Sequence, residues 1–115
     1  MNKNYPIRKT EKLLRELNAC RHALGYLTSV RGASLSLRKE EILQRRIRYL
    51  SRTVAAVEQA LDLLEPTERK IVEGLYFEED GSVERVCAAC ALEKSSVYRY
   101  RARALGKLAA ALYGE

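Results

Sequence analysis

The sequence predicts an all-α protein in which an antiparallel helical hairpin is followed by a helix-turn-helix. Alanine, leucine, arginine and glutamate dominate the 115 residues, which include only two prolines and no tryptophan. This composition is typical of helical chains. Apolar residues recur at alternating steps of three and four, as they do along one face of a helix, and no stretch shows the period of two of a strand. The length allows one ordinary domain, or a small domain with a helical appendage.

The first predicted helix follows a polar stretch, residues 1–9, that shows no pattern. Thr10 is its expected N-cap, since a threonine hydroxyl can accept a hydrogen bond from a first-turn N–H group. Its apolar positions have heptad spacing: Leu13, Leu17, Cys20, Leu24 and Leu27. The stretch 28–36 contains Gly, Ser and Thr, interrupts this pattern, and is predicted to be a loop.

The second predicted helix spans residues 37–65, with Ser34 or Ser36 as its cap. Its stripe is the strongest signal in the first half of the chain: Leu43, Ile47, Leu50, Val54, Val57, Leu61 and Leu64. Such a stripe needs a partner. The first helix can supply it by folding back antiparallel within the chain, which should place Leu17 near Val54 or Val57. The unmatched part should face the C-terminal half or a second chain.

Three shorter helices are predicted beyond Pro66, which should end the long helix because proline lacks an N–H donor. Thr67 is expected to cap the third helix and Ser82 the fourth, with turns at residues 78–81 and 91–95. The fifth helix should run from about Lys94 to Tyr113. The chain is thus divided into a hairpin, residues 1–65, that could serve in oligomerisation, and a DNA-binding half, residues 66–115.

The apolar positions of these three helices are expected to be buried. They are Ile71, Val72, Leu75 and Tyr76 in the third helix, Val83, Val86, Cys87 and Cys90 in the fourth, and Val97, Tyr100, Ala104, Leu105, Leu108 and Leu112 in the fifth.

Charge is distributed unevenly along a chain whose net charge is +6. Residues 94–107 contain five basic residues and no acid, whereas residues 68–84 contain six acids and two bases. This contrast favours one cationic helix that faces phosphates. Six more bases line the outer face of the second helix: Arg38, Lys39, Arg45, Arg46, Arg48 and Arg52. We interpret these mainly as a solvated face, with an auxiliary contact to DNA as the alternative.

The fourth and fifth helices satisfy the packing rules of a helix-turn-helix. Small residues are required where the helices cross and in the turn, and apolar ones around them. The motif core is predicted to be Val86, Cys87, Cys90, Ala91, Leu92, Val97 and Tyr100. Ala91 replaces the usual glycine, so the turn should avoid a left-handed backbone or carry mild strain there.

That register turns a polar face of the fifth helix outward. The candidate DNA-binding residues are Lys94, Ser95, Ser96, Tyr98, Arg99, Arg101, Ala102 and Arg103. Arg99 is the best candidate for a bidentate contact with guanine. Lys94, Ser95 and Ser96 at the helix start favour phosphate. Arg101 and Arg103 should lie nearer the flanks.

Particular residues also carry a family resemblance. Glu68-Arg69 opens the third predicted helix, and Ser96-Val97 followed by Arg103-Ala104-Leu105 and Leu108 marks the fifth. With them, residues 61–112 resemble region 4 of bacterial RNA polymerase sigma factors. A hairpin before such a region is similar to small phage and prophage regulators of the ArpU and RinA type. The resemblance implies a transcriptional activator of late phage genes that binds double-stranded DNA, with RNA polymerase as a further candidate partner.

Other functional classes are less favoured. A metal site at Cys87 and Cys90 would need further ligands, and only Cys20 and His22 remain. No nucleophile with a nearby base and no phosphate-binding glycine loop is evident, so we expect no enzyme, cofactor or small-molecule substrate. No apolar run is long enough for a membrane span. With no secretory signal and three cysteines, we expect a cytoplasmic protein with reduced thiols.

Two alternatives remain open at this stage. A phage small terminase subunit also joins a helix-turn-helix to a helical oligomerisation element, and it would bind DNA for packaging. A helical protein-binding module would have no role on DNA. The heptads could also pair between chains as a coiled-coil homodimer.

Overall fold

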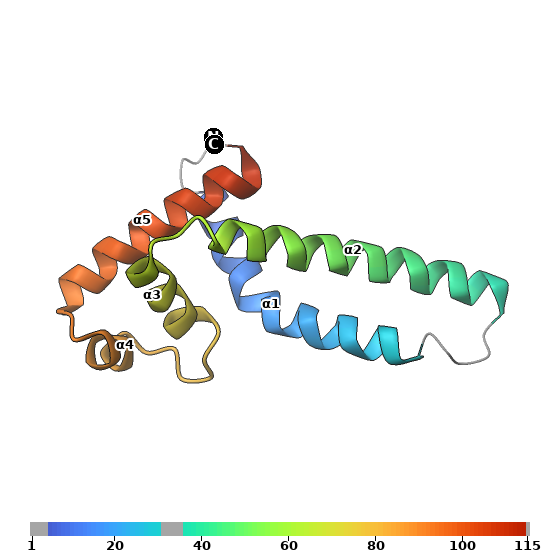
Figure 1. Cartoon of the computed structure of the whole chain (residues 1–115), viewed down its shortest axis with the longest axis horizontal. Coiled ribbons are helices and arrows are strands. Elements are labelled where there is room, and N and C mark those ends of the chain that lie inside the picture. Colours follow the sequence, from blue (N-terminus) through green and yellow to red (C-terminus); the bar gives the residue numbers. More distant parts are fainter. Residues whose placement is uncertain (1–4, 31–35, 115) are drawn as a thin grey trace.

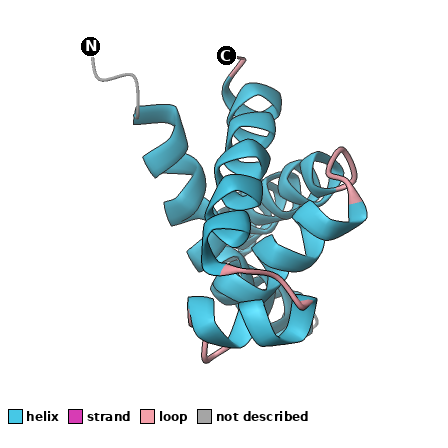
Figure 2. Ribbon diagram, turned by 90° about the vertical axis from the view of Figure 1, so that its left-hand side faces the viewer, coloured by secondary structure: helices cyan, strands magenta, loops and turns pink. Residues whose placement is uncertain are grey.

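The computed structural model describes residues 5–30 and 36–114, and these residues are all-helical, as the sequence predicts. Their five helices are α1 (Tyr5–Val30), α2 (Leu37–Leu61), α3 (Pro66–Tyr76), α4 (Val83–Cys90) and α5 (Lys94–Tyr113). The described part of the chain contains helices and loops and no strand (Figure 2).

The first two helices run antiparallel and form an arm that projects from the rest of the molecule (Figure 1). Because of this arm, the longest dimension is 55 Å and the radius of gyration is 16.9 Å, against about 13 Å for a compact domain of this length. Leu17 is buried in the same cluster as Val54 and Val57. Farther along, Arg21 Nη2 lies 3.0 Å from Glu58 Oε1 and joins the two helices.

Helix α1 begins earlier than the sequence pattern suggests, so the prediction of Thr10 as its N-cap is wrong. The helix starts at Tyr5, with Pro6 in its first turn, where proline is tolerated because no N–H partner is needed. Thr10 is fully buried inside the helix, and its hydroxyl donates a 2.7 Å hydrogen bond to the carbonyl oxygen of Pro6. Residues 5–9, which show no helical pattern in the sequence, are therefore helical.

The helix also ends later than predicted. Residues 28–30, placed in the loop from their composition, continue α1 to Val30. The hydroxyl of Thr28 donates to the carbonyl of Leu24 at 2.7 Å, so this polar side chain is satisfied within the helix. Ser36 caps α2 by accepting a hydrogen bond from the N–H of Lys39, as predicted. The alternative cap, Ser34, lies outside the described residues.

The junction between α2 and α3 differs from the prediction in three ways. α2 ends at Leu61 and not at Glu65. Pro66 does not stop this helix but occupies the first turn of α3, where its fixed backbone geometry suits a helix start. The cap of α3 is Glu65 and not Thr67: the N–H of Glu65 donates a 2.8 Å hydrogen bond to Oε1 of Glu68, which forms a capping box.

One hydrophobic core joins the two predicted halves of the chain. It combines Leu14 and Leu17 of α1 with Val57 and Leu61 of α2, and with Leu108 of α5. Leu14 was not part of the predicted heptad stripe, yet it is fully buried, because α1 packs against both α2 and α5 and needs a wider apolar face. The boundary drawn at residue 65 therefore separates two segments that share their core.

Candidate nucleic-acid interface

Helices α4 and α5 are joined by a three-residue connection with a left-handed residue in it. The hydroxyl of Ser82 caps α4 by accepting a 3.2 Å hydrogen bond from the N–H of Arg85, as predicted. At the other end Ala91 adopts a φ of 53°, and the N–H of Leu92 donates to the carbonyl of Cys87 at 3.1 Å. The turn therefore does not avoid the left-handed region, and Ala91 carries the strain that glycine would not.

A second, smaller hydrophobic cluster lies beneath these two helices. Ile71, Val86 and Val97 are buried at its centre. The partly buried residues packed against them are Leu75, Val83, Cys87, Cys90, Leu92 and Tyr100. Of the predicted motif core, all but Ala91 thus lie in one cluster, and Ala91 itself is exposed in the turn.

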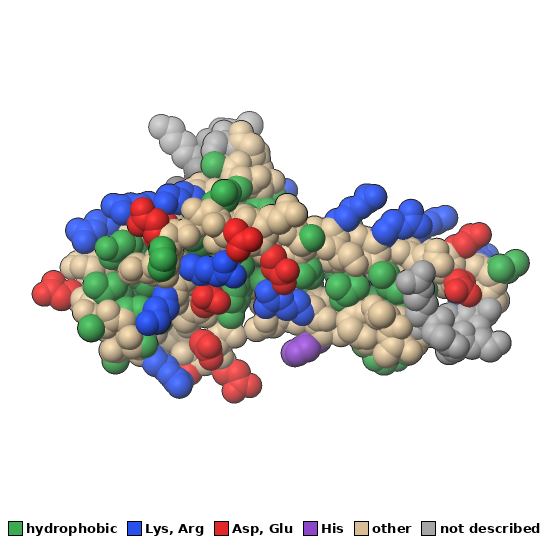
Figure 3. Space-filling model, in the orientation of Figure 1, with side chains coloured by type: hydrophobic (Ala, Val, Ile, Leu, Met, Phe, Trp, Pro, Cys, Tyr) green, Lys and Arg blue, Asp and Glu red, His purple; other side chains and the backbone are tan. Residues whose placement is uncertain are grey.

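The outward face of α5 carries most of the predicted DNA-binding residues. Those that are exposed are Lys94, Ser95, Tyr98, Arg99, Ala102 and Arg103, while Ser96 is partly buried. The guanidinium groups of Arg99 and Arg103 lie 6.0 and 5.7 Å from the ring centroid of Tyr100. In the space-filling view, basic side chains follow the outer edge of α5, whereas acidic and basic side chains alternate over α3 (Figure 3).

Lys94, at the start of α5, already has an acidic neighbour. Its ammonium nitrogen lies 3.5 Å from Oε1 of Glu84 on α4, and both side chains are mostly exposed. The backbone N–H of Glu84 and the Lys94 ammonium lower the pKa of the Glu84 carboxyl below its ordinary value. A phosphate near Lys94 would therefore compete with a solvent-screened carboxylate, which is a weak competitor.

Arg101 is the one predicted DNA-binding residue that faces inward. Its Nε donates to the hydroxyl oxygen of Tyr76 at 2.9 Å, and its Nη2 donates to Oε2 of Glu11 at 2.7 Å. The side chain is one-third exposed. In this structure Arg101 is therefore bound within the fold, because α1 brings a carboxylate to the flank of α5, and its contact with DNA stays a prediction.

The electrostatics of Glu11 explain why this network is charged. Burial raises the pKa of the Glu11 carboxyl, but the hydrogen bonds from Tyr76 and Arg101 and the charges of Arg101 and Arg15 lower it by more. The net pKa is below the ordinary value. Glu11 is therefore an anion at neutral pH, and it ties α1 to α3 and α5.

A second buried carboxylate holds the other half of α5. Glu68 is fully buried, and its Oε1 accepts a 2.8 Å hydrogen bond from the ammonium of Lys107. Burial raises its pKa, while hydrogen bonds from Lys107 and the Glu65 N–H, with the charges of Lys107 and Arg103, lower it below the ordinary value. Its Oε2 has no hydrogen-bond partner among the described residues. Lys107 thus serves the interior of the fold and not the cationic outer face.

Sequence reasoning missed the roles of Glu11, Glu68 and the Tyr76 hydroxyl in these contacts. Only Glu68 had a local signal, since a Glu three residues after a cap residue predicts a capping box. The partners of Glu11 lie 65 and 90 residues away, and no local pattern indicates them.

The described residues hold no group of three or more His, Cys, Asp or Glu side chains that could bind a metal ion. None of the described helices is long and apolar enough to cross a membrane. Cys20, Cys87 and Cys90 are free and partly buried. A comparison with protein-family models, with curated proteins and with solved structures finds no match to this chain.

Proposed function

We propose that the chain is a sequence-specific DNA-binding transcriptional regulator that inserts α5 into the major groove of double-stranded DNA. The observation that carries the proposal is the two-sided character of α5 next to the α4 turn. Val97 is fully buried against α3 and α4, while Tyr98, Arg99 and Ala102 are exposed on the opposite side. An α-helix with its side chains is about 10–12 Å wide, and the major groove is about 12 Å wide.

The start of α5 supports a contact with phosphate. Glu93, its N-cap residue, does not accept a hydrogen bond through its side chain, unlike Ser36 and Ser82 at the starts of α2 and α4. The first-turn N–H groups of α5 are therefore available, and Lys94 adds a positive charge beside them. Contacts of this kind set the position of a helix on DNA, and base contacts from Arg99 would then supply specificity.

The chemistry of the exposed face also favours DNA over a second protein. No large apolar side chain other than Tyr98, which is 44% exposed, stands out on α5. A helix that docks on a protein needs an apolar stripe, whereas one that binds DNA needs cationic and polar groups.

Selection of bound duplexes from a random pool, with and without RNA polymerase, tests the proposal directly. We expect one recurring sequence motif with the wild-type protein alone. With the Arg99→Ala variant, the motif should lose its base preference at one position. Failure to enrich any motif at low salt would overturn the proposal. Light scattering on the same sample distinguishes a monomer or dimer, expected for a regulator, from a ring, which would favour the packaging alternative.

A further inference from the structure

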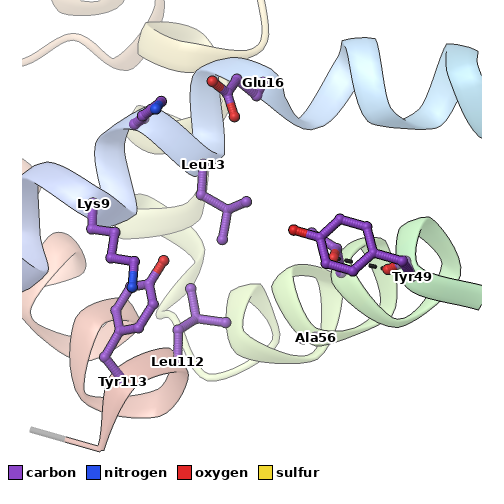
Figure 4. A pocket seen from close by; sticks show the side chains of 9 residues that line it. Lys9, Leu13, Glu16, Tyr49, Ala56, Leu112 and Tyr113 are labelled. Carbon is purple, nitrogen blue, oxygen red and sulfur yellow. Dashed lines mark hydrogen bonds between the residues drawn. The ribbon is translucent and has the colours of Figure 1, made fainter. Parts of the chain in front are cut away.

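An open groove lies between α1, α2 and α5, on residues that the proposed DNA interface does not use. Its volume is about 490 Å³. Leu13 of α1 and Leu112 of α5 point into it, and the ring of Tyr49 of α2 lies across from them (Figure 4). Ala56 of α2 completes the apolar lining. These side chains form the apolar floor of the groove and remain accessible to solvent. Because apolar side chains are stabilised by burial, the floor is suited to contact with another molecule.

The groove continues along the arm as a stripe on α2. Ile42, Tyr49 and Ala56 are spaced seven residues apart and are all exposed, Ile42 by 55% and Tyr49 by 69%. Residues at this spacing share one face of a helix. From Ile42 to Ala56 the stripe is about 21 Å long at 1.5 Å per residue, which matches about four turns of a docked helix.

The rim of the groove is basic. Lys9 and Lys12 line it on α1, with Glu16 as the one acid among the described lining residues. The ammonium of Lys9 stands 4.7 Å from the ring centroid of Tyr113, at the wall of the groove. Arg45 and Arg52 are exposed on α2, at helical spacing from Tyr49 and Ala56. Basic side chains gather along this helix in the space-filling view as well (Figure 3).

We propose that this groove docks an acidic amphipathic helix of a partner protein. Its apolar side chains, at spacings of three, four and seven residues, cover Leu13, Tyr49, Ala56 and Leu112. Its carboxylates face Lys9, Lys12 and Arg52. Apolar anchors in a groove with complementary charge at the rim are the general mode by which helices bind grooves. The proposal is independent of DNA binding by α5.

Charge and polarity favour this occupant over two others. Residues 42–57 contain four arginines and no acid, so two copies facing each other through α2 would bring like charges together. A nucleic acid would match the basic rim, but its phosphates would gain nothing from covering leucine side chains. An acidic amphipathic helix satisfies both the rim and the floor.

The test is a selection of peptides from a random helical library on the full-length protein. Two variants add the same charge to neighbouring exposed alanines of α2: Ala56→Glu inside the groove and Ala55→Glu outside it. We expect the enriched peptides to be acidic and to repeat apolar residues at helical spacing. Ala56→Glu should weaken their binding by about tenfold or more, because it places a carboxylate against the apolar side chains and carboxylates of the docked peptide. Ala55→Glu should leave binding within about twofold.

Further measurements separate the remaining outcomes. Tyr49→Ala, which adds no charge, should also weaken the selected peptides, and circular dichroism checks that each variant folds. Both glutamate variants should bind DNA equally, because neither substitution lies on α5. The peptide measurements need no DNA, so a failure of the α5 proposal would leave the groove proposal standing. Peptides that are basic, or that bind wild type and Ala56→Glu alike, would overturn the proposal. A DNA duplex that displaces the peptides would also overturn it, because the groove would then bind nucleic acid. So would self-association through the groove, seen as a molar mass in solution that rises with protein concentration and is lower for Ala56→Glu.

Discussion

The guanidinium of Arg101 donates a 2.7 Å hydrogen bond from Nη2 to Oε2 of Glu11, a residue 90 positions earlier in the chain. The hydroxyl of Tyr76 donates to the same carboxylate oxygen, also at 2.7 Å. Through these bonds the arm, α3 and α5 meet at one anion. The direction of α5 relative to the arm therefore depends on a charge pair as well as on apolar packing.

Replacing Glu11 by glutamine should destabilise the protein by about 1–3 kcal/mol at pH 7, because a charged acceptor of two hydrogen bonds becomes a neutral one. The folded-state pKa of Glu11 lies below its ordinary value of 4.5. Its contribution is therefore present above pH 4.5 and is lost as the pH falls through the lower folded-state pKa. Urea unfolding from pH 7 to pH 3 should show the two proteins converging.

Glu16→Gln is the matched control for this prediction, since Glu16 is exposed on the same helix. It should change the free energy of unfolding by less than about 0.5 kcal/mol. A cost for Glu11→Gln that is the same at pH 3 and at pH 7 would show that the charge of Glu11 is not what stabilises the fold.

Lys107→Met should cost about 3–5 kcal/mol at pH 7, because it leaves the fully buried carboxylate of Glu68 without its counter-charge. In this variant the pKa of Glu68 should rise above its unfolded value, so stability should increase as the pH falls toward that value. Adding Glu68→Gln should recover part of the loss at pH 7. Urea unfolding of the single and double variants measures these free energies. If the losses from the two substitutions simply added, the Glu68 carboxylate would not be what destabilises Lys107→Met.

Arg99→Ala should weaken binding to a selected DNA site by about 1–3 kcal/mol and relax base preference at one position. Arg45→Ala on the arm is the control, and it should have much less effect because that face of α2 is interpreted as not contacting DNA. Fluorescence anisotropy titrations on the selected site and on single-base variants measure both. Equal losses would mean that the arm, and not α5, forms the DNA surface.

Lys94→Ala should weaken binding to all duplexes alike, because an ammonium at a helix start contacts phosphate and not bases. The plot of log affinity against log salt concentration should become less steep by about one unit. Glu84→Gln should act in the opposite direction at low salt, since it removes the carboxylate that lies 3.5 Å from the Lys94 ammonium. A loss confined to one base sequence would place Lys94 at a base edge instead.

Ala91→Gly should stabilise the protein by up to about 1 kcal/mol, because glycine adopts the left-handed backbone at φ 53° without the strain of a side chain. The same substitution at Ala88, an exposed position inside α4, should instead destabilise it by about 0.5–1 kcal/mol. Thermal unfolding of the two variants and the wild type shows whether the melting temperature rises for Ala91→Gly and falls for Ala88→Gly. Destabilisation by both would show that the turn is not strained at Ala91.

The all-helical fold and most of its buried positions could be predicted from the sequence. The heptad stripe predicted for the second helix is buried at Leu43, Leu50, Val54, Val57 and Leu61, and at Leu64 just beyond the end of α2, while Ile47 is partly buried. The bounds of α5 and the cap at Ser82 were also predicted correctly, and Ser36 is one of the two caps predicted for α2. Periodicity and capping act between residues that are close in the chain, so the local sequence carries them.

Two errors came from competition between local signals. Thr10 resembles a cap, but Pro6 offers an earlier helix start and the hydroxyl of Thr10 bonds back to its carbonyl. Thr67 was predicted as the cap of α3, but Glu65 caps the helix and Glu68, three residues later, completes the capping box. At Ala91 the sequence left two outcomes open, a turn without a left-handed residue or a strained one, and the structure has the left-handed residue.

The sequence by itself determined most of the apolar residues that face inward along each helix and where the cationic face of α5 begins, because both depend on spacings of three and four residues. Only the tertiary structure decided which of the basic residues are free to meet a partner. Arg101 and Lys107 are held by Glu11 and Glu68, whereas Arg99 is exposed. A cationic side chain pairs with a carboxylate that the fold brings within a few ångströms, and that carboxylate can come from any distance along the chain.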